Sequence, residues 1–313
     1  MIKKYTLLFF TTLFFSGIAF SQEIQIFKVE DFDLRGKVKS CLVITDYGRE
    51  LFEFDKMGRL NRTITQYNES DQDITLYKYE GDNLVEKRME SYKDDVLDAA
   101  TSMVNFYSID TVSPRKVLEK IISYDKQFLE QQEYFYDEEN RLRKIVISNA
   151  EGVDETTIEY QQYKNETTQS VFHNGLLEKM ERVSEKKVGN TQHKVILTKE
   201  FVDGEPNSAV EKTFDASGRL LKTETFNYDV SKKQFVSSQK VRVGYGSDGM
   251  PMKETTETQN AKSVKEFIFQ FDNSTEKNWI KKITTPSNAY STRRITYYPE
   301  EEAQDQEKGE NPN

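Results

Sequence analysis

Hydrophobic positions alternate with polar ones along most of the chain, in short segments separated by turn residues. In 220–228, for example, Leu220, Phe226 and Tyr228 share one parity, although Lys222 and Glu224 between them have the same parity. A period of two residues is typical of β-strands with side chains on alternate faces. The pattern predicts a first strand over 36–45, a second over 49–54, and strands alternating with turns to about residue 298.

One turn sequence occurs three times. It spans 54–60, 136–142 and 214–220, and in each copy an aromatic residue precedes Asp and Leu ends the turn. Asp at the first turn position and Gly at the fourth are typical of a type I turn, with Gly free to take positive φ before the next strand. The Asp carboxylate can accept backbone N–H groups within its own turn, and Asn tolerates the left-handed geometry when it replaces Gly. The predicted structural turn residues are Asp55, Gly58, Asp137, Asn140, Asp215 and Gly218.

These copies, with several degenerate ones, indicate a repeat. Aromatic residues recur at roughly 24–29 residues, a period typical of repeat architectures. The aromatic-Asp-x-x-Gly-Arg-Leu core, the Tyr77-Lys78-Tyr79 strand and the Asn278-Trp279 pair resemble the YD-repeat, or RHS-like, family of bacterial exported proteins. That resemblance implies a β-hairpin repeat without catalytic residues. Large members build a closed shell around a toxin, whereas this chain has no room for an enclosed cargo domain.

The composition affects the expected packing. Hydrophobic residues make up 36% of the chain and charged residues 31%. A two-layer sandwich needs more continuous apolar faces than this composition offers. We therefore expect an all-β fold: an elongated or curved antiparallel meander of repeated hairpins, forming one continuous unit over 22–298.

The two ends of the chain differ from this array. Residues 1–21 are predicted to be a cleavable signal peptide, with basic Lys3 and Lys4, an apolar run over 5–20 and a small residue at Ser21. Gln22 follows in place of Cys, so a lipoprotein is not expected. The acidic residues 299–313 are predicted to be disordered. The expected protein is exported to the periplasm or the extracellular space, with no membrane span after signal cleavage.

The charge narrows the choice of partners. The whole chain has a net charge of −9, from 44 Lys and Arg against 53 Asp and Glu. Removal of Lys3 and Lys4 leaves 42 against 53, or −11. An acidic surface argues against nucleic acid and leaves a protein, a neutral glycan or a cation as the partner. Cys41 is the single cysteine, so no intrachain disulfide forms, and its apolar neighbours predict a buried side chain.

The sequence gives little support for a catalytic site. The chain has two histidines, His173 in a predicted turn and His193 at a strand start, and neither suits a Ser-His-Asp site. No His/Cys cluster has zinc spacing, and Asp71-Gln72-Asp73 lacks the further ligands of a calcium loop. We expect no catalytic residue, no metal and no cofactor. Trp279 is a possible binding residue if its ring is exposed; otherwise it covers the end of the core.

The sequence favours a non-enzymatic binding or scaffold module for a protein or glycan partner. The acidic charge and a similarity to hairpin-repeat antitoxins leave open a neutralising protein of the antitoxin or immunity type. A polysaccharide hydrolase is a further alternative, because carboxylates are abundant enough for a catalytic pair.

Overall fold

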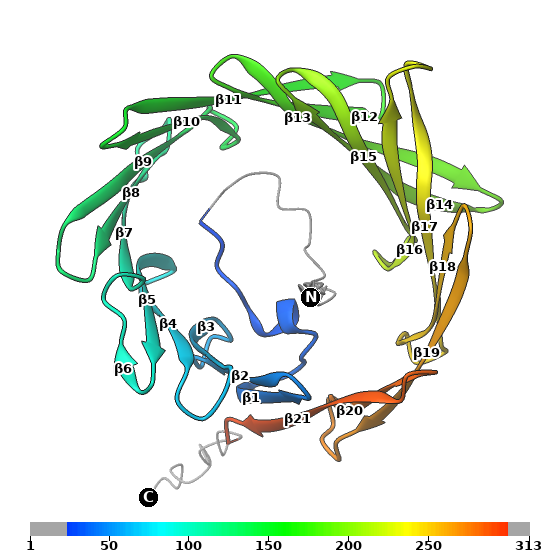
Figure 1. Ribbon diagram of the computed structural model, residues 1–313, viewed down its shortest axis with the longest axis horizontal. Helices are drawn as coiled ribbons and strands as arrows, with labels where there is room; N and C mark the ends of the chain where they lie inside the picture. The colour runs from blue at the N-terminus through cyan, green and yellow to red at the C-terminus, as the bar shows by residue number, and fades with distance from the viewer. Residues whose placement is uncertain (1–23, 300–313) are drawn as a thin grey trace, which may run out of the picture.

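The protein is a closed antiparallel β-barrel. The computed structural model describes residues 24–299, and one sheet contains every strand among them. The first long strand, β1 (Val38–Thr45), pairs with β2 (Gly48–Phe54) on one side and with β21 (Ala289–Tyr297) on the other. The β1–β21 pairing, here called the seam, closes the ring that Figure 1 shows.

The other strands follow round the ring in chain order. They are β3 (Leu60–Gln66), β4 (Gln72–Glu80), β5 (Asn83–Lys93), β6 (Val96–Leu97), β7 (Met103–Asp110), β8 (Lys116–Ser123), β9 (Phe128–Tyr136), β10 (Leu142–Asn149), β11 (Val153–Tyr163), β12 (Glu166–His173), β13 (Leu176–Val188), β14 (Thr191–Val202), β15 (Glu205–Phe214), β16 (Leu220–Asp229), β17 (Gln234–Tyr245), β18 (Pro251–Thr258), β19 (Lys262–Phe271) and β20 (Trp279–Thr285). The two-residue β6 pairs with β5 alone, so twenty of the twenty-one strands form the wall.

The Asp-containing turns follow β2, β9 and β15. Because neighbouring strands are antiparallel, these turns lie at the same end of the barrel, here called the Asp-turn end. Each one adjoins a register shift between its two strands, as between Glu53 and Phe54. Such β-bulges increase the local twist and bend the strand, which helps a sheet to curl.

A segment before β1 lies inside the ring. It contains the short 3-10 helix η1 (Val29–Phe32), and Figure 1 shows its trace crossing the interior of the barrel. At the seam this segment contributes to a buried core with wall residues Cys41, Phe54 and Leu60. Farther back, Ile24 packs against a second core formed on β8 to β11.

The expected elongated or curved array is therefore wrong in shape, although the antiparallel meander of hairpins is confirmed. The strand periodicity predicted the hairpins, but the seam joins residues about 250 positions apart, and no local pattern encodes it. Closure pairs both edges of the sheet, which removes the exposed edge strands of an open array.

Two connections interrupt the regular hairpins. Residues 93–100 contain β6 and turns. Residues 111–115 form the turn between β7 and β8. The predicted signal peptide and nearly all of the predicted disordered tail lie outside the described residues.

Candidate functional site

The two faces of the wall are distinguished by the N-terminal segment. Cys41 and Phe52 are directly paired and both contact the buried core of that segment, so their parity faces the lumen. The strand register carries this assignment from strand to strand. It returns consistently at the seam, where Ile295 pairs with Cys41 and Arg293 pairs with Val43. Every strand therefore has one inward and one outward set of side chains.

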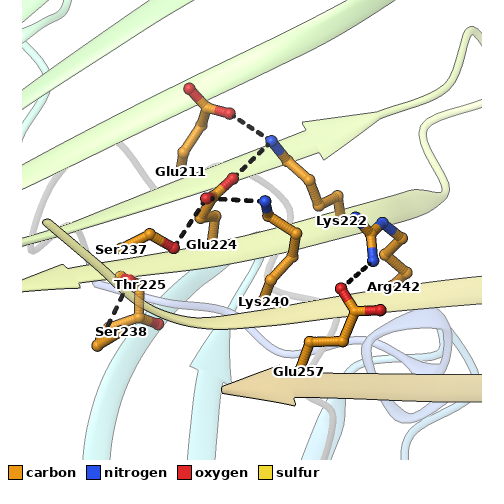
Figure 2. Close-up of polar contacts among 9 residues, drawn as sticks. All are labelled: Glu211, Lys222, Glu224, Thr225, Ser237, Ser238, Lys240, Arg242 and Glu257. Atoms are coloured by element: carbon orange, nitrogen blue, oxygen red, sulfur yellow. Dashed lines mark hydrogen bonds and ion pairs between the residues drawn. The ribbon is translucent and has the colours of Figure 1, made fainter. Parts of the chain in front are cut away.

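The outer face carries ladders of ion pairs at mid-strand. Lys222 Nζ lies 2.8 Å from a Glu211 carboxylate oxygen and 3.1 Å from one of Glu224, which Lys240 also contacts at 3.1 Å. Figure 2 shows this network crossing from β15 to β17, with the Arg242–Glu257 pair continuing it to β18. The same face bears further pairs on other strands, among them Arg62–Glu53, Arg88–Glu86, Lys116–Glu133 and Arg182–Glu166.

The inner face has a covered half on β1 to β12. Its side chains include many aromatic and aliphatic groups, and several are at most 7% exposed: Cys41, Phe54, Asn105, Val117, Glu119, Tyr134, Ile145, Ile158 and Gln169. The segment that begins at Ile24 covers part of this half, through its contacts with both buried cores.

The inner face has an open half on β13 to β19. Apolar inward positions such as Val183, Ile196 and Val210 are interspersed there with polar and charged ones. Several of the polar positions are exposed to solvent: Lys179, Lys212, Asn227, Gln239, Ser263 and Lys265. Hydroxyl groups such as those of Thr198, Thr223 and Thr225 lie on the same face. This half of the wall therefore presents hydrogen-bonding groups to the interior of the barrel.

The N-terminal segment is held at the seam by a compact set of polar contacts. The Arg293 guanidinium donates to the carbonyl oxygens of Phe32 at 2.9 Å and Asp33 at 3.2 Å. Its carbon lies 3.5 Å from the centre of the Trp279 ring, and Trp279 Nε1 donates to the Asp33 carboxylate at 3.0 Å. The Asn278 side chain accepts from the Arg35 N–H at 2.8 Å and donates to the Arg35 carbonyl at 2.9 Å.

Burial changes the titration of the groups beside these contacts. Burial lowers the pKa of Lys282, and the neighbouring Arg293 lowers it further. Burial also lowers the pKa of Arg293. The Cys41 thiol has its pKa raised to about 11 by burial, against a smaller opposing effect of Arg293. The wall at the seam therefore combines two half-buried cations with a buried, inert thiol.

A buried carboxylate lies on the covered half. Glu119 accepts Asn105 Nδ2 at 2.6 Å and the Tyr134 hydroxyl at 2.7 Å. Burial, followed by the charge of Glu119, raises the pKa of both Tyr107 and Tyr134 far above the ordinary phenol value. Among residues 24–299 no cation forms an ion pair with Glu119, so hydrogen-bond donors hold its charge.

The repeated turn residues are placed at the Asp-turn end and do not converge on one site. Asp55 Oδ1 accepts the N–H groups of Met57 and Arg59 at 2.9 Å, and its Oδ2 accepts Arg59 Nε at 2.8 Å. Asp137 and Asp215 make the same bonds in their own turns. The positions of Gly58, Asn140 and Gly218 have φ of +78°, +59° and +80°, the left-handed region that each turn requires.

Each Arg of these turns also contacts a tyrosine of the next hairpin. Arg59 lies over the Tyr79 ring at 4.3 Å, and the Tyr79 hydroxyl donates to the Leu60 carbonyl at 2.7 Å. Arg219 and Tyr245 repeat the arrangement, with the hydroxyl donating to Leu220. The sequence indicated Tyr79 as part of a repeated strand but did not predict its contact with the turn.

The remaining candidates, Trp279, His173 and His193, make local contacts. Trp279 is 8% exposed and covered by Arg293, so its ring offers no free face for a sugar. His173 Nδ1 lies 3.3 Å from the Thr156 hydroxyl, and His193 Nε2 lies 3.3 Å from the Thr191 hydroxyl. Within the described range, no group of three His, Cys, Asp or Glu side chains is arranged to hold a metal ion. None of the helices in that range is both long and apolar enough to cross a membrane.

Comparison with known proteins adds one weak structural similarity. No family model matches the sequence, and no curated protein matches it. Among solved structures, a porin-like protein from Bacteroides vulgatus ATCC 8482 is similar at a TM-score of 0.26 and 10% identity, over 84% of this chain and 98% of that one. A score this low establishes neither a common fold nor a common function.

The resemblance to the YD-repeat or RHS-like family is therefore wrong as an assignment of the chain. The repeated turns exist, but the strands that they join close into a single barrel. Turn chemistry of this kind stabilises any antiparallel hairpin, so it was a poor guide to the family.

Proposed function

We propose that the protein is an exported, non-enzymatic binding module that holds an extended hydrophilic chain, a protein segment or a glycan, against the open half of its lumen. The proposal rests on one observation: the closed wall has exposed polar groups on its inner face. Lys212 and Gln239, for example, point inward and are exposed. A concave surface with convergent polar groups is the usual form of a ligand site.

The charged side chains of the outer face favour a barrel that is surrounded by water. A lipid-facing wall has an apolar band, and a Lys or Arg at the bilayer midplane costs about 2–4 kcal/mol there. Here a continuous network lies at outward-facing positions in the middle of the strands, formed by Lys222, Glu224 and Lys240 (Figure 2). This arrangement favours a water-facing barrel over a pore.

The inner wall also supports a binding role through its charge arrangement. Lys179 pairs directly across the sheet with Glu200, and Glu254 with Lys265 as an ion pair of 3.4 Å. Lys212 has the uncharged neighbours Ile196 and Thr223 on the adjacent strands. It is therefore the position on the open half where a charge change should most disturb a ligand.

A binding screen tests the proposal. The mature chain, residues 22–298, would be screened by thermal shift against glycans, cell-wall fragments and peptides, and hits would be measured by calorimetry. Lys212→Glu should weaken a true lumen ligand by about tenfold or more, or roughly 1.4 kcal/mol. Lys253→Glu makes the same charge change on the outer face and should leave the affinity unchanged.

Two results would contradict the proposal. Equal effects of the two variants would place the ligand outside the lumen. Release of dye from phospholipid vesicles by the detergent-free chain would show that the barrel inserts in membranes, against the charge of its outer face.

A further inference from the structure

The inner wall at the seam carries a set of side chains, here called the seam groove, that is separate from the open half. This seam groove is defined by Cys41, Phe52, Phe54, Trp279 and Arg293. These residues belong to β1, β2, β20 and β21, so the groove spans both sides of the closing strand pair. It is occupied by the segment that contains η1.

The backbone of the occupant forms several hydrogen bonds with the groove, and its side chains Val29 and Leu34 are buried in the core there. Arg293 and Asn278 between them satisfy four backbone groups of residues 32–35, namely three carbonyl oxygens and one N–H. In addition, Val29 N–H donates to the Gly58 carbonyl at 3.0 Å. Bonds to the main chain give affinity for any segment of suitable shape, and side-chain pockets then select the sequence.

Two side chains of the occupant provide that selection. The Phe32 ring packs against Phe52 and Phe54, with centroids 4.5 and 5.4 Å apart. The next residue, Asp33, accepts Trp279 Nε1 beside the half-buried cation Arg293. The groove is thus apolar on one side and positive on the other, which complements an aromatic residue followed by a carboxylate.

The segment makes these contacts with the barrel wall. The occupant contains four residues of regular structure, so its burial comes from the groove and not from a core of its own. Gly36 and Lys37 alone separate its last anchored residue, Arg35, from β1. We propose that the seam groove is a peptide-binding site, filled in cis by residues 24–35, and able to accept in their place a partner polypeptide with an aromatic-acidic pair like Phe32-Asp33.

Cys41 reports whether the groove is filled. It is the single cysteine of the chain, is 1% exposed, and packs in the same buried core as Val29 and Leu34 of the occupant. When residues 24–35 leave the groove, the thiol meets solvent and becomes available to a maleimide. The rate of labelling therefore measures the vacant state of the groove.

The experiment uses the full mature chain and its Asp33→Ala variant. Loss of the carboxylate should raise the Cys41 labelling rate about tenfold, and a synthetic peptide of residues 24–35 added to the variant should restore protection in a saturable manner. A peptide with Ala in place of Asp33 should protect at least tenfold less well. Glu30→Ala is the matched control, because that exposed carboxylate lies on η1 away from Trp279.

The outcomes are distinct. An unchanged labelling rate in Asp33→Ala, or no protection by the added peptide, would overturn the proposal. If Asp33→Ala unfolds by circular dichroism, Asp33→Asn replaces it, since the amide oxygen still accepts a hydrogen bond. Fluorescence anisotropy of the labelled peptide with the wild-type chain gives an independent measurement, in which exchange should be slow but saturable and its absence would again contradict the proposal.

Discussion

The guanidinium carbon of Arg293 lies 3.5 Å from the centre of the Trp279 ring, and the two residues belong to the last two strands of the barrel. Arg293 also pairs across the seam with Val43 of β1. The same guanidinium donates to the carbonyl of Phe32, in the segment inside the ring. One side chain therefore joins the final strands, the first strand and the lumen segment.

Arg293→Lys should destabilise the barrel although it keeps the positive charge. Lys lacks the planar fork that contacts two carbonyl groups and stacks on an indole. Loss of these contacts should lower the free energy of unfolding by about 1–3 kcal/mol. Urea unfolding followed by circular dichroism measures the change. Arg294→Lys, on the outer face one residue later, should stay within about 0.5 kcal/mol, and equal losses would refute the role given to Arg293.

The tyrosine that follows each Asp-containing turn should contribute measurably to stability through the hydrogen bond of its hydroxyl group. Tyr79→Phe and Tyr245→Phe each remove a hydroxyl that donates to a strand carbonyl. Each should cost about 1 kcal/mol, and because the two sites are far apart in the ring, the double variant should show the sum within about 0.5 kcal/mol. Tyr290→Phe, 52% exposed on the outer face, is the control and should have little effect. Chemical denaturation of the wild type and the four variants shows whether the repeated contact stabilises the fold.

The Asp215 turn should make the stability of the folded protein depend on pH in the acidic range. Burial alone would raise the pKa of Asp215, but hydrogen bonds from the backbone and guanidinium of Arg219 outweigh it and hold the pKa below its ordinary value. A depressed pKa in the folded state gives stability that is present above the unfolded value of about 3.9 and is lost as pH falls through the folded value.

Asp215→Asn should therefore be less stable than the wild type at pH 7, and the difference should shrink below about pH 4. Thermal unfolding from pH 3 to pH 7 measures it. Asp203→Asn, in the exposed turn after β14, controls for the substitution itself. A difference between Asp215→Asn and wild type that grew on acidification would contradict the assigned role of the carboxylate.

The local parts of the fold could be predicted from the sequence because local chemistry encodes them. Asp55 and Gly58 determine a turn within a few residues, and period-two patterning determines a strand. The position of Trp279 could not be predicted in this way. Its partner Asp33 lies far away in the sequence, and only the closure of the ring brings the two together.

The division of the inner face into a covered and an open half could not be predicted from the sequence either. Lys222 and Glu224 share a strand parity with Phe226, so a single strand gives no clear inner and outer face. The assignment becomes clear only when the register is followed through all strands to the seam. A search for Lys–Glu pairs at matching positions of successive hairpins was a signal that could have identified the water-facing wall.

Glu119 should control the titration of two tyrosines on the covered half. Tyr134 donates to its carboxylate, and burial together with the Glu119 charge raises the pKa of Tyr107 and Tyr134. Glu119→Gln removes the charge but keeps the shape and an acceptor oxygen. The two phenols should then ionise at lower pH than in the wild type, without reaching the ordinary value, because burial is the larger cause and persists. Absorbance at about 295 nm during alkaline titration measures this, with Glu130→Gln on the next strand as control. Tyrosine titration that is identical in wild type and Glu119→Gln would show that Glu119 does not act on these phenols.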